Sequence, residues 1–296
     1  MRIIENCAEN CAVALGNFDG LHKAHMKIID SCVEYSKKSG ILSGVVLFDR
    51  HTSEIFGEET ALLTTMEEKL AVLEKSGVDF VHIMHFDKAL AETNGETFIK
   101  RILSSFSAEA FFAGYDYSFG KNAACRADDL KKMGEILNFK TFITECVTEN
   151  GETVSSTLVR NYVKNGDMQG AARLLGRPYF LVGEVVRGFG NGARSLFPTA
   201  NVRPGEKKLL PPDGVYKAAA KLETGTYKCA VNIGKNPTFG AKERTVEGFV
   251  LDFEGELYGK KICIEFEERI RGDRKFESVE ELKKQIESDI EKVRGV

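Results

Sequence analysis

The hydrophobic pattern of the chain changes once, near residue 178, and this change constrains the fold more than any other feature. Before it, short apolar runs alternate with segments of helical periodicity; after it, apolar runs follow one another with turn residues between them. The first pattern is typical of parallel βα units and the second of an antiparallel sheet. Because 296 residues exceed one ordinary hydrophobic core, we expect two domains, residues 1–178 and 179–296.

Residues 1–178 are expected to form a Rossmann-like α/β domain, a doubly wound parallel sheet with helices on both faces. The expected strands are CAVAL, GVVLF, VDFVHIM, EAFFA and FKTFIT. Helices are expected at residues 27–39, 65–77, 156–165 and 167–175. Thr65 and Glu68 have the spacing of a capping box at the start of the second helix. Gly40 and Gly77 are typical helix terminators.

Residues 179–296 are expected to form a small antiparallel β-barrel with a terminal α-helix. The expected strands are YFLVGEVV, GVYKAAAKL, TYKCAVNIG, TVEGFVLDF and KKICIEFEERI. Ser278 and Glu281 again have the spacing of a capping box. The apolar residues of the segment that follows share one helical face, and they are Leu282, Ile286, Ile290 and Val293. An amphipathic helix is therefore expected to pack on the barrel.

Composition narrows the function. A hydrophobic fraction of 43% and a charged fraction of 29% are typical of a globular protein that is neither disordered nor membrane-spanning. A net charge of −3 argues against a surface dominated by nucleic-acid contacts. The first residues, MRIIENCAENCAVALGNF, lack the apolar core of a signal peptide, which predicts a cytoplasmic protein. The seven cysteines lack zinc-site or disulfide-scaffold spacing and are expected to be reduced thiols.

The segment GNFDGLHKAH follows the first expected strand of the α/β domain. Gly16 and Gly20 permit a tight turn, and His22 and His25 lie three residues apart at the start of the next helix. A helix start offers free backbone N–H groups and the positive end of the helix dipole, so the imidazoles there can help to hold phosphate. Ligands of such sheets bind at the carboxyl ends of the strands, where this segment lies. The pattern indicates a triphosphate site.

GNFDGLHKAH resembles the HxGH signature of nucleotidyltransferases, and more closely the GxFDGxHxGH form of bacterial bifunctional riboflavin kinase/FMN adenylyltransferases. GYDYSFGKNA at residues 114–123 is similar to that family's GxDFxFG stretch, and SSTLVR at 155–160 to its SSTxIR segment. LLGRPYFLVGEVV is similar to the junction between its two domains. The resemblance covers essentially the whole chain.

For the α/β domain the resemblance implies that the phosphate of FMN attacks the α-phosphorus of MgATP and releases pyrophosphate. His22 and His25 would act on the phosphates, and Asn17 and Asp19 would shape the turn. The residues that would meet ATP are Gly16, Asn17, Phe18, Asp19, Gly20, Ser155, Ser156, Thr157 and Arg160. The residues that would meet flavin are Phe48, His51, Asp116 and Phe119.

For the barrel the resemblance implies transfer of phosphate from ATP to riboflavin. Thr199 and Asn201 of the PTAN segment would hold Mg²⁺ and the phosphates of ATP, since a hard cation prefers oxygen ligands. Glu247 would accept the proton of the ribityl 5′-hydroxyl, and Arg271 would contact the flavin. The chain contains no GxxxxGK[ST] motif, which excludes a P-loop kinase.

Departures from the family pattern leave alternatives open. Ala24 replaces the usual glycine between the histidines, FDRHT loses both prolines of FxPHP, and Leu196 replaces the usual glycine before FPTAN. Leu196 motivates a lone FMN adenylyltransferase whose barrel binds flavin without turnover. All departures together motivate a non-catalytic flavin- or nucleotide-binding regulator. A nucleotidyltransferase for another phosphate ester is a third alternative. Flavin and nucleotide are the expected partners of a monomer or weak homo-oligomer.

Overall fold

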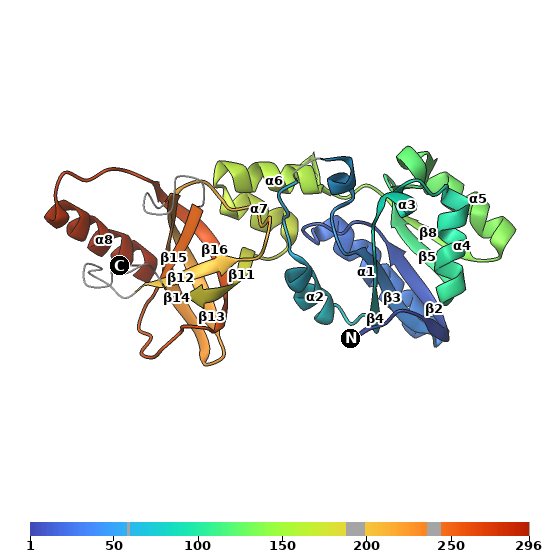
Figure 1. The fold of residues 1–296 in the computed structure, drawn as a ribbon, viewed down its shortest axis with the longest axis horizontal. Coiled ribbons are helices and arrows are strands. Elements are labelled where there is room, and N and C mark those ends of the chain that lie inside the picture. Colours follow the sequence, from blue (N-terminus) through green and yellow to red (C-terminus); the bar gives the residue numbers. More distant parts are fainter. Residues whose placement is uncertain (58–59, 188–198, 236–243, 296) are drawn as a thin grey trace. The chain divides into compact units, whose positions relative to one another are not determined.

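The computed structural model describes residues 1–57, 60–187, 199–235 and 244–295, apart from the side chains of Phe56 and Lys235 (Figure 1). The chain divides into two compact units, Met1–Ser156 and Thr157–Val296. This division follows packing, whereas the boundary predicted at residue 178 separates two functions and stays a prediction. Within the described ranges, no helix is long and apolar enough to cross a membrane.

A six-stranded parallel sheet forms the centre of the first unit, in the order β1-β4-β3-β2-β5-β8. Its strands are β1 (Arg2–Ile3), β2 (Cys7–Leu15), β3 (Leu42–Phe48), β4 (Phe80–Met84), β5 (Phe106–Gly114) and β8 (Lys140–Thr144). All five expected strands and the parallel sheet are confirmed. The additional strand β1 has only two residues, too few for a recognisable pattern. Short hairpins are formed by β6 (Ser118–Phe119) with β7 (Cys125–Arg126) and by β9 (Thr148–Glu149) with β10 (Glu152–Thr153).

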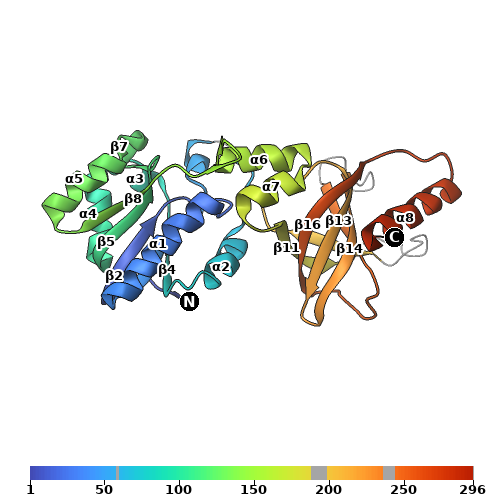
Figure 2. The ribbon, with the colours of Figure 1, turned by 180° about the vertical axis from the view of Figure 1, so that it is seen from behind.

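Helices cover both faces of this sheet, and Figure 2 shows α1 lying across its strands. The helices are α1 (Lys23–Ser39), α2 (Met66–Glu74), α3 (Lys88–Ala91), α4 (Gly95–Ser105) and α5 (Ala127–Leu137), with 3₁₀ turns η1 (Thr52–Phe56) and η2 (Lys121–Ala123). Along β2, Cys11, Val13 and Leu15 join one core cluster. Ala12 and Ala14 join the other, which contains the buried side of α1. Both faces are apolar because both are buried.

The first helix begins four residues earlier than expected. His22 caps α1 because its Nδ1 accepts the backbone N–H of His25 at 3.3 Å. Gly40 ends the helix with a φ of 70°. The capping box predicted at Thr65 is present at the start of α2, which ends at Glu74, before the expected Gly77. The predicted range began at Lys27 because the apolar periodicity starts only with Ile28, and a histidine is an unusual N-cap.

A closed barrel forms most of the second unit, and all neighbouring strands in it are antiparallel. The strands are β11 (Tyr179–Val186), β12 (Ala200–Pro204), β13 (Gly214–Leu222), β14 (Gly225–Lys235), β15 (Arg244–Val250) and β16 (Lys261–Gly272). The barrel and its terminal helix are confirmed. The sequence did not reveal β12, because this short polar segment has no apolar alternation. Pairing with β11 and β15 imposes its conformation.

Three helices accompany the barrel. The first two, α6 (Ser156–Asn165) and α7 (Met168–Leu175), lie where the sequence predicts them, and α7 packs on β11 and β16. The last, α8 (Val279–Arg294), packs on β13 and β14 with Val293 buried. Ser278 caps α8 by accepting the N–H of Glu281 at 3.1 Å. The Glu281 carboxylate accepts the N–H of Glu277 at 3.0 Å, so the expected capping box forms in modified form.

Candidate active sites

The segment between β2 and α1 is a tight turn at the carboxyl end of the sheet. Phe18, Gly20 and Leu21 have φ values of 47°, 85° and 44°, which are left-handed and unfavourable for the two non-glycine residues. A Cβ at Gly16 would lie 3.1 Å from the buried ring of Phe18, so close packing favours glycine there. The turn is therefore held in a strained shape by its surroundings.

Asp19 makes several of the hydrogen bonds that keep the turn in this shape. Its side chain is 2% exposed, and its two carboxylate oxygens accept the N–H groups of Leu63 at 3.3 Å and Thr64 at 3.1 Å. Gly20 donates its N–H to the hydroxyl of Thr64 at 2.9 Å, and Ser156 donates its hydroxyl to the carbonyl of Asp19 at 2.8 Å. These contacts fit the turn-shaping role expected for Asp19.

Lys69 is a contact of the turn that the motifs did not indicate. It lies on α2, is 8% exposed, and donates Nζ to the backbone carbonyl of Asn17 at 2.9 Å. The Asn17 side chain donates to the hydroxyl of Thr52 at 3.3 Å. A lysine this deeply buried is rare without a partner of this kind. Because Lys69 fixes the backbone between Gly16 and Phe18, it can control the shape of the turn without touching a ligand.

Replacing Lys69 by methionine should test this control. Loss of a hydrogen bond to a charged donor costs about 1.5–3 kcal/mol, which corresponds to roughly a tenfold to hundredfold lower rate if it appears in the transition state. We expect the rate of FMN adenylylation to fall by this amount. Lys131→Met, which changes an exposed lysine on α5, is the matched control. An unchanged rate in folded Lys69→Met protein would contradict a role for Lys69.

The two histidines of the motif are stacked on each other. Their ring centroids lie 3.7 Å apart with an angle of 16° between the planes, and the Phe18 ring meets His25 edge-on at 5.3 Å. His22 is 4% exposed. Because Nδ1 of His22 accepts the N–H of His25, a neutral His22 carries its proton on Nε2. Both imidazoles are thus positioned at the N-terminus of α1, where backbone N–H groups and the helix dipole favour anions.

Strand order brings other predicted residues to the same edge of the sheet. Phe48 ends β3 and Asp116 follows β5, and these strands flank β2 on its two sides. Asp116 is exposed, whereas Phe119 is 6% exposed. The rings of Phe48 and Phe119 both contact Phe98, at 6.4 Å and 6.1 Å. His51 caps η1 and lies 2.7 Å from the hydroxyl of Ser53.

The segment Ser155–Arg160 is divided between the two units. Ser155 and Ser156 end the first unit, whereas Thr157 and Arg160 lie on α6 in the second. Ser156 is tied to the turn through the carbonyl of Asp19. The triphosphate contacts expected for this segment stay a prediction.

In the barrel, strand register gathers several predicted residues on one face. Asn201 on β12 pairs with Glu247 on β15, which pairs on its other side with Asn232 on β14. Asn232 pairs with Val215 on β13, and Val215 pairs with Arg271 on β16. Directly paired residues point to the same face of a sheet. We call these five residues the outer row, because the residues that alternate with them fill the barrel interior.

Glu247 occupies a half-buried position in the outer row. Burial raises the pKa of Glu247, and a hydrogen bond from the Thr245 hydroxyl to Oε1, at 3.5 Å, acts in the opposite direction. The same hydroxyl lies 3.3 Å from the carbonyl of Gly234 on β14. A carboxylate with a raised pKa is a stronger base than an ordinary glutamate. The position therefore suits removal of a proton from a hydroxyl group.

The Thr245 contact leads to a pH prediction. Thr245→Val keeps the shape of the side chain but removes the hydrogen bond that lowers the pKa of Glu247. The pKa should then rise further, so that less deprotonated base is present on the acidic side of the profile. The acidic limb of kcat/KM for riboflavin phosphorylation should move to higher pH, and Thr245→Ser should retain the original limb. If the acidic limb of the kcat/KM profile did not move in Thr245→Val protein, the Thr245 hydrogen bond would not control the pKa of the catalytic base.

A cavity of about 280 Å³ opens next to Asn201 and Glu247. Ala200 and Gly248, the chain neighbours of the two outer-row residues, line it, and so does Thr199, two residues before Asn201. Its remaining wall includes Val185, Phe253, Leu257 and Tyr258. The segment around Phe253 and Tyr258 was missed because its sequence carries no recognised motif. Leu196, Pro198 and the glycine-rich segment before them lie outside the described residues.

Comparison with known proteins identifies the family. A family model described as FAD synthetase matches residues 4–158, and one described as riboflavin kinase matches residues 175–296. The bifunctional riboflavin kinase/FMN adenylyltransferase of Bacillus subtilis is 34% identical over 285 residues, 94% of this chain and 89% of that protein. The Escherichia coli K12 protein of the same description is 35% identical, covering 95% and 91%.

The chain belongs to the bifunctional riboflavin kinase/FMN adenylyltransferase family. Membership confirms the predicted family and gives the chain its two activities, phosphorylation of riboflavin and adenylylation of FMN. Riboflavin, FMN and ATP are the small molecules that this family uses.

A solved structure shows the same fold over the full length. A crystal structure described as a macrolide-efflux protein from Streptococcus pneumoniae superimposes with a TM-score of 0.88 and 27% identity. The match covers 99% of this chain and 98% of that one. Both units of this chain therefore have counterparts in a crystal structure. The efflux description belongs to that protein and is not transferred to this chain.

The seven cysteines are free thiols in the structure. Burial raises the pKa of Cys11, Cys32 and Cys229 to about 12. Such thiols are almost fully protonated at neutral pH and therefore poor nucleophiles. These three thiols are therefore poor candidates for nucleophilic chemistry at either site.

Proposed function

We propose that the barrel phosphorylates riboflavin at the outer row and that the first unit adenylylates FMN at the turn before α1. The observation that carries the first assignment is the register of Glu247 with Asn201, beside a cavity that contains Thr199. The second rests on the stacked histidines at the N-terminus of α1, at the carboxyl edge of a parallel sheet.

In the barrel, Glu247 accepts the proton of the ribityl 5′-hydroxyl as this oxygen attacks the γ-phosphorus of ATP, and the bond from that phosphorus to the β,γ-bridging oxygen breaks to release ADP. The raised pKa of Glu247 improves it as a base. The side-chain oxygens of Thr199 and Asn201 are the hard donors that Mg²⁺ prefers, so these residues fit the ion. When bound, Mg²⁺ neutralises charge on the transferring phosphate. The strands hold Asn201 and the base in fixed register, which orients the hydroxyl relative to the phosphate.

The cavity next to the outer row is a suitable place for the nucleoside part of ATP. Phe253 and Tyr258 offer apolar and aromatic surface to a base, while Thr199 lies on the same wall. A nucleotide held there could place its phosphates near Thr199, which lines the cavity two residues before Asn201. The nucleotide would then occupy the cavity, and the flavin the outer row.

In the first unit, catalysis consists of positioning and charge stabilisation, since no covalent intermediate is required. His22 and His25 donate to the phosphate oxygens of ATP as the FMN phosphate attacks the α-phosphorus. The backbone N–H groups at the start of α1 add to this anion site. Phe48, His51, Asp116 and Phe119 remain proposed flavin contacts, and Ser155, Ser156, Thr157 and Arg160 remain proposed triphosphate contacts.

One assay tests the assignment of both reactions to this chain. Purified protein is incubated with riboflavin, ATP and Mg²⁺, and the flavins are separated by chromatography. We expect FMN to appear first and FAD to follow. Untouched riboflavin together with conversion of added FMN would indicate a lone adenylyltransferase, the alternative motivated by Leu196. Binding without any conversion would indicate a regulator. Size-exclusion chromatography of the same preparation tests the proposed monomer or weak homo-oligomer.

A further inference from the structure

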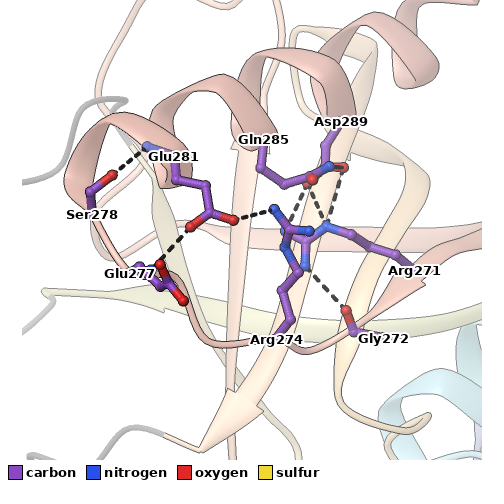
Figure 3. Close-up of polar contacts among 8 residues, drawn as sticks. All are labelled: Arg271, Gly272, Arg274, Glu277, Ser278, Glu281, Gln285 and Asp289. Carbon is purple, nitrogen blue, oxygen red and sulfur yellow. Dashed lines mark hydrogen bonds and ion pairs between the residues drawn. The ribbon is translucent and has the colours of Figure 1, made fainter.

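Asp289 makes a buried polar contact between α8 and the barrel (Figure 3). Its carboxylate accepts Nε of Arg271 at 2.9 Å and pairs with Nη2 of Arg271 at 2.8 Å. Gln285, one turn earlier on α8, donates its amide to the same carboxylate at 2.8 Å. Nε of Arg271 also donates to the second carboxylate oxygen at 3.2 Å, so both oxygens of Asp289 face the guanidinium in a charge-assisted contact.

The pair is buried. Asp289 is 3% exposed, and the Arg271 side chain is 19% exposed. A buried ion pair contributes little net stability, because loss of hydration offsets the attraction. What it does provide is a fixed orientation of the Arg271 guanidinium, since the carboxylate of Asp289 holds one edge of it. Since an apolar pair would stabilise the helix contact equally well, the charges at this position call for a role besides stability.

The place of Arg271 suggests that role. Arg271 is at one end of the outer row and Glu247 is toward the other, three strand-to-strand steps away. At about 4.8 Å per step this is roughly 14 Å along the barrel surface. If the ribityl 5′-hydroxyl of riboflavin lies at Glu247, a separation of this size leaves Arg271 within reach of its tricyclic ring. The helix α8 packs on β13 and β14, the two strands between Arg271 and Glu247.

The chain around Arg271 is folded so that its guanidinium keeps one orientation. Nη1 of Arg271 donates to the carbonyl of Gly272 at 3.1 Å. The Phe276 ring lies against the guanidinium groups of both Arg271 and Arg274, at 5.7 Å and 4.6 Å. Arg274 in turn donates to Glu281 in the first turn of α8 at 3.1 Å. The connection between β16 and α8 is therefore attached to the helix at both of its ends.

We propose that Asp289, supported by Gln285, is a positioning residue of the kinase site, which holds the Arg271 guanidinium in the orientation that binds the flavin. Asp289 does not touch the substrate and acts only through Arg271. The inference rests on the proposed function and on the flavin contact that the family resemblance implies for Arg271. The terminal nitrogens of Arg271 keep further N–H groups beyond those used by Asp289 and Gly272, and these are available to flavin oxygen atoms.

The test is a double-mutant cycle on riboflavin phosphorylation. Asp289→Asn keeps the size of the side chain but removes its charge, and should raise KM for riboflavin roughly tenfold or more with kcat little changed. Arg271→Ala should raise KM at least as much. In the Arg271→Ala background, Asp289→Asn should have no further effect on KM, since its action requires the guanidinium. Equal effects in both backgrounds would overturn the proposal, as would an unchanged KM in folded Asp289→Asn protein.

The chain offers a matched control at the other end of α8. Arg294 and Asp252 form an exposed ion pair, with Nη2 and Oδ1 2.6 Å apart, that also attaches α8 to the barrel. Asp252→Asn weakens helix attachment without reaching the outer row, so KM for riboflavin should stay at the wild-type value. If Asp252→Asn raised KM as much as Asp289→Asn, general loosening of α8 would explain both, and the proposal would fail.

A second measurement remains valid if Asp289→Asn folds poorly. Gln285→Ala removes one hydrogen bond of the carboxylate and leaves the ion pair, so riboflavin binding should weaken by a smaller factor. Binding is followed by riboflavin fluorescence without ATP, which separates this proposal from the proposed activity. If wild-type protein bound riboflavin without phosphorylating it, the proposed kinase function would be wrong, but the positioning role of Asp289 would still stand. Gln285→Ala protein that binds riboflavin with wild-type affinity would count against positioning through Asp289.

Discussion

Glu247→Gln is expected to lower riboflavin phosphorylation by two to four orders of magnitude, the range that a positioned general base contributes. Glutamine has nearly the same size and can take the same place between Asn201 and Asn232, but it cannot accept the proton of the 5′-hydroxyl. The loss should appear in kcat, because the residue acts in the transition state. The measurement is the rate of FMN formation from riboflavin at saturating ATP and Mg²⁺.

The FMN adenylylation rate of the same variant is its internal control. It should remain at the wild-type value, because the stacked histidines belong to a unit with its own core. Loss of both activities in folded Glu247→Gln protein would show that the two sites are not independent. A kinase rate within about tenfold of wild type would fall below the range for a general base and would remove Glu247 from that role.

His25→Ala should produce the reverse pattern. Removing one preorganised donor to a developing negative charge typically lowers kcat by about a hundredfold to a thousandfold. We therefore expect FMN adenylylation to fall by this amount and riboflavin phosphorylation to continue. FAD formation from supplied FMN, measured at saturating ATP, gives the first rate, and FMN formation from riboflavin gives the second.

His82→Ala is a matched control for His25→Ala. His82 lies on β4, where Nδ1 is 3.0 Å from the backbone carbonyl of Ile4, away from the turn before α1. Its replacement removes an imidazole from the same unit without touching the proposed phosphate site. If both variants lost FMN adenylylation equally, destabilisation of the unit would be the simpler cause, and the assignment of His25 to the phosphates would be lost.

Elements with a strong apolar pattern could be predicted, and those formed through pairing could not. The runs that became β2, β5 and β13 alternate or bury their side chains in a way that the sequence reveals. By contrast, β12 contains Asn201, Arg203 and Pro204 within five residues, and it is a strand because β11 and β15 lie on its two sides. The start of α1 was misplaced for a local reason, since a histidine provides its N-cap.

The candidate sites divide in the same way. Residues within short motifs, such as His22, His25 and Asn201, could be predicted as site residues because the neighbouring residues of each motif identify them. Lys69 and Asp289 could not, because each acts on a partner distant in sequence, Asn17 and Arg271 respectively. The residues that flank a lysine on a helix do not indicate which backbone carbonyl its side chain will contact. Contacts of this kind depend on the packing of elements, which the sequence pattern specifies only as layers.

The outer row has a consequence for how this barrel tolerates change in length. Successive side chains of a strand point to opposite faces, so one residue inserted in β15 ahead of Val246 would turn the Glu247 carboxylate into the apolar interior and bring Val246 to the substrate face. The same insertion in the connection between β15 and β16 would leave every member of the row in place. Natural or engineered variation in length should therefore accumulate in the connections, while the strands that carry Asn201, Glu247 and Arg271 keep their residue count.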